Sequence, residues 1–414
     1  MRKKLSVSIC LLSFWTASVH AGESPPCEIT TAQDILSCAL KNHPDLLRAE
    51  IQLKNLGAYD ALARQRPNPE LESEAASQNG DDNPSFKAQA AYLHTIELGS
   101  KRKKRGIQAT ARKDLILAQA ALAKEEVARK TVLNLHRLRQ ISSEKKIVDE
   151  ALSTFATIIK QYKSRPALSP EQNVSLNAFI LAQGLYVLKN SALSQEQESL
   201  KAYFDIATGV PFETVLKNLP GKKETWPSVE ASTEALTVRG SQLQASLAQA
   251  AVSKSEVDLA ASAAKPDLEI GPMVEIERGR NQDSESYGGA LNLPLPLYQQ
   301  NQGGIALAKA ESEQADLSAQ LRRRELNLEL QALMNNYRHA VSSFKNIPTV
   351  SQMEAKHKNM EELFERGIVS AALIIEAHRL MAEFAKEQNE HELKAIEALW
   401  TIYALQGKIL EERL

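Results

Sequence analysis

The sequence predicts a mainly α-helical protein with a small β part, built from long antiparallel helical hairpins and four β-strands. Its 414 residues include only 17 Gly and 16 Pro, which favours long helices over many short loops. Apolar residues recur at steps of three and four along two extended segments, as in the seam of a coiled coil. In four other stretches apolar and polar residues alternate, which is the period of a β-strand.

The charge balance narrows the range of partners. The chain carries 50 Lys and Arg against 51 Asp and Glu, a formal net charge of -1. A protein that binds nucleic acid through its phosphates needs an excess of basic residues, and this composition has none. We therefore expect no nucleic-acid partner.

The N-terminus has the order of a secretory signal peptide. Arg2, Lys3 and Lys4 precede an apolar run over residues 5–19, and Ala21 is a small residue suited to cleavage. The alternative is an N-terminal membrane anchor, but the run is too short to span a bilayer. We expect residues 1–21 to be the signal peptide and residues 22–414 the exported chain.

Two cysteines remain after cleavage, because Cys10 leaves with the signal peptide. Cys27 and Cys38 can form a disulfide in an exported protein. Two free thiols are an equal alternative, since a sequence does not give the geometry of the bond. Lipidation of Cys27 is disfavoured, because the Ser-Pro-Pro at residues 24–26 is not a small apolar lead-in.

The chain divides into two similar halves. A helical segment over 46–64 leads into Pro-Glu-Leu-Glu at 69–72, and one over 243–264 leads into Pro-Asp-Leu-Glu at 266–269. A strand-like stretch and then a long helix follow in each half. This order predicts two structural repeats, over about residues 30–205 and 233–412.

Each half is expected to end in a long helical hairpin. In the first half a helix over about 101–162 is followed by a short turn and a partner helix over about 169–205. In the second half the last helix covers about 370–412. Pro348 is expected to kink one of the two hairpins, because proline removes a backbone N–H and clashes with the preceding turn.

The alternating stretches cover residues 70–75, 86–98, 267–277 and 287–297, with His94 out of pattern on an apolar side. Such strands suit a membrane barrel, and two amphipathic hairpins on a soluble core are the alternative. Pro272 favours that alternative or a local bulge, since a strand paired on both sides has no place for proline. If the apolar faces meet lipid, the acidic residues expected to face the lumen are Glu70, Glu72, Glu74, Glu97, Asp267, Glu269, Glu275 and Glu277.

Four strands are too few to close a membrane barrel, since the smallest have about eight. An open sheet edge cannot face lipid either, because its backbone groups would lack hydrogen-bond partners. Strands that span a membrane therefore require an oligomer. No segment after the signal peptide is long and apolar enough to predict a transmembrane helix.

Two motifs lie where a strand leads into a long helix. Residues 95–102 are Thr-Ile-Glu-Leu-Gly-Ser-Lys-Arg, and residues 293–303 are Leu-Pro-Leu-Pro-Leu-Tyr-Gln-Gln-Asn-Gln-Gly. Together with the doubled order of helix, β-hairpin and helical hairpin, they resemble the TolC family of outer-membrane efflux channels over essentially the whole mature chain. The second motif is most similar to the outer-membrane subunits of cobalt-zinc-cadmium type cation exporters.

The resemblance implies a homotrimer whose strands close one twelve-stranded β-barrel in outer-membrane lipid and whose helices continue as an α-barrel through the periplasm. It implies a passive exit duct, with no catalytic residue and no cofactor, that docks on a periplasmic adaptor (membrane fusion) protein and an RND-type inner-membrane pump. Heavy-metal cations are the expected cargo. A drug-efflux or type I secretion channel is the first alternative, and a soluble periplasmic coiled-coil scaffold is the second.

The same resemblance assigns sites. The hairpin turns match the periplasmic tips where adaptors dock, with ordinary helix–helix turns as the alternative, and the residues concerned are Arg165, Leu168, Ser169, Gly367, Ile368, Val369 and Ser370. Glu376 matches an acidic ring at the periplasmic entrance, in which three copies would raise one another's pKa. Phe364 and Val369 depart from the residues that hold the closed state in the founding member.

Other chemistry finds little support in the sequence. The Lys-Arg-Lys-Lys-Arg run at 101–105 is interpreted as an anchor at the membrane interface, with a solvated surface as the alternative. Hydrolase, phosphate-loop and zinc-peptidase motifs are absent. His357, His378 and His391 are too far apart along their helices to gather a metal, so we expect no metal site.

Overall fold

The fold was analysed in a computed structural model of the chain. The structure describes residues 27–78, 85–229, 239–279, 283–344, 347–348 and 350–414. The expected signal peptide, residues 1–21, lies outside the described residues.

The two halves of the chain place their elements in the same order. The first half contains α1 (Ala32–Asn42), α2 (Pro44–Lys54), α3 (Gly57–Arg64), β1 (Glu70–Gln78), β2 (Ser85–Ile96), α4 (Lys101–Lys163), α5 (Pro170–Thr208) and α6 (Phe212–Lys217). The second contains α7 (Ser241–Ala263), β3 (Leu268–Gly279), β4 (Ser284–Asn292), α8 (Gln302–Phe344), α9 (Val350–Glu365) and α10 (Ala371–Leu405). In both, helix leads to β-hairpin and then to a long helical hairpin.

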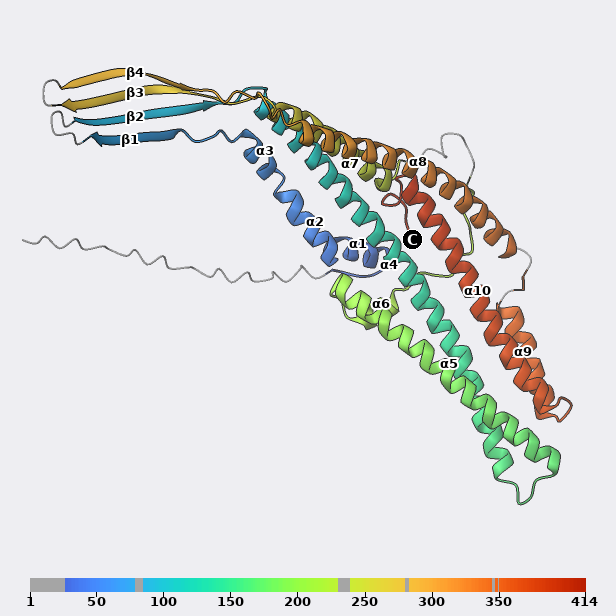
Figure 1. The fold of residues 1–414 in the computed structure, drawn as a ribbon. Coiled ribbons are helices and arrows are strands. Elements are labelled where there is room, and N and C mark those ends of the chain that lie inside the picture. The colour runs from blue at the N-terminus through green and yellow to red at the C-terminus, as the bar shows by residue number, and fades with distance from the viewer. Residues whose placement is uncertain (1–26, 79–84, 230–238, 280–282, 345–346, 349) are drawn as a thin grey trace, which may run out of the picture.

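The molecule is elongated, with its sheet and its helical turns at opposite ends. Figure 1 shows the four strands projecting beyond the helices at one end, while the α4–α5 and α9–α10 turns lie at the other. Among the described residues, no helix has the length and apolar character needed to cross a membrane.

The four strands form one antiparallel sheet in the order β1-β2-β3-β4. Its register pairs Glu74 with Gln89 and Gln89 with Glu275, so these three side chains share a face. Six of the eight acidic residues expected on one face lie there: Glu70, Glu72, Glu74, Glu269, Glu275 and Glu277. The opposite face carries exposed apolar side chains, among them Leu71, Phe86, Tyr92, Ile270, Tyr287 and Leu291.

The strands end earlier than the alternation predicts on the side nearest the helices. β4 ends at Asn292 rather than near residue 297, because Pro294 and Pro296 have no N–H to give to a ladder. Glu97 lies just after β2 and Asp267 just before β3. These two carboxylates therefore lie one residue outside the strands, at the junction with the helices, and the expectation that they face the lumen stays a prediction.

Pro272 interrupts the pairing between β2 and β3. The β2–β3 ladder lacks pairs at Gly271 and Pro272, while on the other side of the strand Pro272 stays paired with Gly289. A Cβ added to Gly271 would lie 1.7 Å from the carbonyl oxygen of Tyr92, so a larger residue has no room there. The sheet accommodates the proline by a local loss of hydrogen bonds.

The long helices have the bounds that the sequence predicts to within a few residues, apart from α10. α4 contains 63 residues, which corresponds to about 95 Å at 1.5 Å per residue. Near the turn it packs on α5 through Phe155 and Phe179, which are fully buried with ring centroids 5.7 Å apart. In the second half Leu330 and Tyr337 of α8 pack against α10. α10 ends at Leu405 rather than near residue 412, since Gly407 adopts a positive φ of 74°.

Pro348 breaks its helix instead of kinking it. α8 ends at Phe344 and α9 begins at Val350, and Ile347 and Pro348 lie outside both helices. The expected kink is wrong in this respect, because the missing N–H and the ring clash stop the helix altogether.

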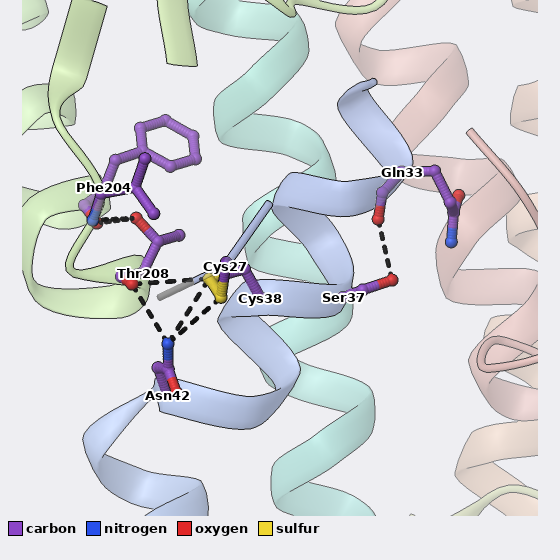
Figure 2. Close-up of a disulfide and its surroundings, with 8 residues drawn as sticks. Cys27, Gln33, Ser37, Cys38, Asn42, Phe204 and Thr208 are labelled. Atoms are coloured by element: carbon purple, nitrogen blue, oxygen red, sulfur yellow. Dashed lines mark hydrogen bonds between the residues drawn. A yellow bond between two sulfur atoms is a disulfide. The ribbon is translucent and has the colours of Figure 1, made fainter. Parts of the chain in front are cut away.

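A disulfide joins Cys27 to Cys38, which lies in α1. The sequence leaves open whether these two cysteines are bonded or free, and the structure shows that they are bonded. Asn42 lies beside it, and its Nδ2 donates a hydrogen bond of 3.2 Å to the backbone carbonyl of Thr208 at the end of α5 (Figure 2). The start of the described chain is thus attached to the first helical hairpin.

Candidate functional site

The two hairpin turns that the sequence marks as docking tips lie together. A groove of about 1040 Å³ runs between them, and its lining includes Arg165 from the α4–α5 turn and Gly367, Val369 and Ser370 from the α9–α10 turn. Both turns are at the end of the molecule farthest from the sheet (Figure 1). Four of the seven predicted tip residues therefore share one concave surface.

The α4–α5 turn is fixed by its own hydrogen bonds. The Ser169 hydroxyl accepts from the Gln172 N–H at 3.2 Å, and the Gln172 side chain accepts from the Ser169 N–H at 3.1 Å. This capping box satisfies two N–H groups at the start of α5, and Pro170 at the first helical position needs none. On the other side of the turn the Arg165 guanidinium lies over the Tyr162 ring, 5.0 Å from its centroid.

The α9–α10 turn depends on a glycine. Gly367 has a φ of 72°, a left-handed conformation that favours glycine. Its N–H donates to the Phe364 carbonyl at 2.8 Å, and the Ile368 N–H donates to the Leu363 carbonyl at 3.0 Å, which is the Schellman pattern of helix ends. Ile368 is 60% exposed. The turn thus presents an apolar side chain on a rigid backbone.

Glu376, the expected entrance carboxylate, is paired within its own helix. Arg379 donates to both of its carboxylate oxygens, at 2.8 and 2.5 Å, and also donates to Glu383 at 2.6 Å. The hydrogen bond from Arg379 lowers the pKa of Glu376. Within one chain Arg379 therefore lowers the pKa of Glu376, whereas a ring of three carboxylates is expected to raise it.

The basic run at the start of α4 is bound to carboxylates. Lys101 lies 2.7 Å from Asp267, Lys104 lies 2.7 Å from Asp258 of α7, and Arg105 binds Glu97. Glu97 and Asp267 are thus neutralised at the junction between the strands and the helices. Three of the five basic side chains are therefore paired with carboxylates where the strands meet the helices, and an anchoring role at the membrane interface stays a prediction.

Two histidines that sequence reasoning excluded as metal ligands, His357 and His378, lie together with Glu361 between α9 and α10. One ligand atom from each of His357, Glu361 and His378 lies within 4.8 Å of the others. The expectation that His357 and His378 are too far apart is wrong, because it considered spacing along the helices and not the fold-back between them. His391 is not part of this group.

A signal for this group exists in the sequence. His357 and His378 are equally distant from the centre of the turn at Gly367 and Ile368, so an antiparallel hairpin places them opposite each other. Glu361 follows His357 by four residues, which puts both on one helix face. Burial, and next the neighbouring His357, lower the pKa of His378 to about 4, so its imidazole is neutral at physiological pH.

No protein-family model and no curated protein sequence matches the chain, whereas solved structures do. The CmeC outer membrane channel of Campylobacter jejuni has a TM-score of 0.68 at 16% identity, covering 98% of this chain and 94% of that one. A membrane protein from Pseudomonas aeruginosa has a TM-score of 0.70 at 12% identity, over 91% and 90%. The open MtrE outer membrane channel of Neisseria gonorrhoeae has 0.67 at 12%, over 91% and 89%. Over nearly its whole length the chain therefore has the fold of these solved structures, two of which are outer-membrane channels.

Proposed function

We propose that the chain is the outer-membrane channel of a tripartite efflux system, assembled as a homotrimer. Three four-stranded sheets would close a twelve-stranded β-barrel in the outer membrane, and the helices would form an α-barrel that extends into the periplasm. The channel is a passive duct. Its cargo is delivered by an inner-membrane pump of the RND type through a periplasmic adaptor.

The sheet is the observation that carries this proposal. Among the described residues β1 and β4 each pair with a single strand, so both edges have backbone groups free to bind a neighbouring copy. One face is acidic and the other is apolar and exposed, as at Tyr287, which is 79% exposed. Closure by other copies would satisfy the edges, with the apolar face toward lipid and the acidic face toward the lumen.

A soluble coiled-coil scaffold accounts poorly for the same features. A soluble sheet of this kind buries its apolar face against a core, but here the sheet projects away from the helices (Figure 1). Leu71 and Leu291 on that face are 74% and 66% exposed. A continuous exposed apolar surface of this kind requires lipid or a partner.

Heavy-metal cations are the proposed cargo. An acidic strand face around a lumen favours cations over anions, and the motif at residues 293–303 resembles the cation-exporter subgroup. The adaptor is proposed to dock at the two tips, where the shared groove offers a concave surface of mixed polarity and the exposed Ile368 an apolar contact. Drug efflux or protein secretion through the same channel would leave the fold and the tips unchanged.

Membrane fractionation of the full-length protein, followed by gel filtration in mild detergent, tests the assembly. Outer-membrane partition with the mass of three chains is expected. A soluble periplasmic monomer or dimer would contradict the channel. Deleting the gene and comparing growth with Co²⁺, Zn²⁺, Cd²⁺ and a panel of drugs tests the cargo, and sensitivity to drugs alone would refute cation efflux while leaving the channel intact.

A further inference from the structure

The group formed by His357, Glu361 and His378 has no role in the proposed duct. It lies between α9 and α10, about three helical turns from the tip and far from the acidic strand face, and Glu361 also lines the groove between the tips. We propose that these three side chains form a binding site for a divalent transition-metal ion of the Zn²⁺ class. The inference does not depend on the channel function.

The distances suit such an ion. The His357 Nε2 lies 3.0 Å from the His378 Nδ1, and the His378 Nε2 lies 3.3 Å from the Glu361 Oε1. At Zn–N distances of about 2.0–2.1 Å, two ligand atoms of a tetrahedral ion lie about 3.3 Å apart. The two distances involve different nitrogens of His378, of which one would bind the ion. One ligand atom from each of the three residues lies within 4.8 Å of the others, so rotation of the side chains would have to bring these atoms to a common centre.

One buried nitrogen of the group, the His378 Nε2, lacks a hydrogen-bond partner among the described residues. His378 as a whole is 2% exposed. The edge-to-face ring of Phe155 lies 5.0 Å away and offers it no polar contact. A buried nitrogen of this kind costs free energy unless a hydrogen bond or an ion satisfies it. The Glu361 Oε1 lies 3.3 Å from this nitrogen, so the nitrogen points into the candidate site.

The donor set selects the class of metal. Two imidazoles and one carboxylate are borderline ligands that suit Zn²⁺ and its neighbours, whereas Ca²⁺ and Mg²⁺ prefer oxygen ligands alone. Three protein ligands leave a fourth position for water or another group. The carboxylate of Glu361 is also held from outside, because the Thr154 hydroxyl of α4 donates to its Oε1 at 3.3 Å.

The position of the site gives a bound ion a mechanical effect. His357 and Glu361 belong to α9 and His378 to α10, so the ion would bridge the two helices of the second hairpin. Thr154 extends the contact to α4 of the first hairpin. Metal would thereby fix the α9–α10 pair against the first hairpin close to the tips.

Calorimetric titration of ZnCl₂ into the full-length protein in detergent, without a histidine tag and after removal of metal with EDTA, tests the site. We expect one Zn²⁺ per chain. His357→Gln, Glu361→Gln and His378→Gln should each raise the dissociation constant at least tenfold. His391→Gln is the matched control, because that histidine is exposed on α10 and lies outside the group, and it should bind as the natural protein does.

A second readout identifies the ligands. Co²⁺ bound in place of Zn²⁺ should give the visible absorption of a four-coordinate ion, and Glu361→Gln should change that spectrum. Glu361 is part-exposed, so this variant decides the question even if His378→Gln does not fold. The proposal is overturned if the natural protein binds no stoichiometric Zn²⁺, if Glu361→Gln and His357→Gln bind like it, or if His391→Gln weakens binding equally.

Discussion

Lys101, the first residue of α4, and Asp267, the residue before β3, are 166 positions apart in the chain and form an ion pair with 2.7 Å between Nζ and Oδ1. Asp267 also accepts a hydrogen bond from the Leu98 N–H at 3.3 Å. The contact joins the place where a strand of the first half becomes a long helix to the place where a helix of the second half becomes a strand.

Replacing Lys101 by Met should therefore destabilise this junction. Both side chains of the pair are partly buried, and the loss should be about 1 kcal/mol because Asp267 keeps the Leu98 N–H. Thermal unfolding in detergent measures it. Lys103→Met is the control, since Lys103 is exposed in the same run. Equal unfolding midpoints for the two variants would show that the pair contributes nothing.

If the adaptor docks at the tips, a charged substitution there should stop transport and leave the assembly of the trimer intact. Ile368→Glu places a charge on an exposed side chain of the α9–α10 turn and does not alter the backbone. It should abolish export while leaving trimers intact, as measured by growth in cargo and by gel filtration. Gly367 is a poorer position for this test, because any side chain there would strain the left-handed backbone.

Leu410→Glu is a suitable control for the tip variant. Leu410 is also an exposed apolar residue, but it lies beyond the end of α10 and far from both turns. It should leave export unchanged. Full export by Ile368→Glu, or an equal loss in both variants, would remove the docking role of this turn.

Substitutions of Glu376 and of Arg379 should have opposite effects on the ion selectivity of the channel. If three copies of Glu376 face the channel entrance, Glu376→Gln should lower the permeability ratio of cations to anions in planar bilayers. Arg379→Gln should raise it, because it removes the cation that pairs with Glu376 and Glu383. We expect changes of about twofold, since exposed charges are screened by salt. Unchanged ratios in both variants would exclude an entrance role.

The sequence predicts the parts of the fold that depend on local pattern. The expected helix over about 101–162 agrees with α4 at Lys101–Lys163, and the alternation in the strands places six acidic residues on one face. Both features repeat with a fixed period, so each residue supports the assignment of the next. Prolines also predict where a helix or a strand is disturbed, although at Pro348 the helix ends where only a kink is expected.

Contacts between distant segments are what the sequence does not predict. The prediction that the basic run at 101–105 anchors the chain at the membrane interface takes no account of Asp258 and Asp267. These partners lie more than 150 positions away along the chain. The dismissal of His357 and His378 has the same cause, since only the turn at Gly367 brings them together. Spacing along a helix says which residues share a face, but not what that face meets.

Burial of His136 predicts a stability that depends on pH. This α4 side chain is 5% exposed, and burial, and next the charge of Arg139, lower its pKa from 6.5 to about 4. Lys223 acts in the same direction and Glu392 in the opposite one. The folded protein therefore keeps this imidazole neutral where the unfolded chain already binds a proton.

The sign of the effect follows from that difference. Below pH 6.5 the unfolded chain takes up a proton that the folded one does not, so the free energy of unfolding falls until about pH 4. The contribution of His136 should be on the order of 2 kcal/mol lost by pH 5. Thermal unfolding between pH 7.5 and 5 measures this loss. His136→Gln should reduce the slope of the unfolding free energy against pH but not abolish it, because the pKa of His378 is lowered in the same way. A slope equal to that of the natural protein would mean that His136 is protonated in the fold, and the neutral state inferred from its burial would be wrong.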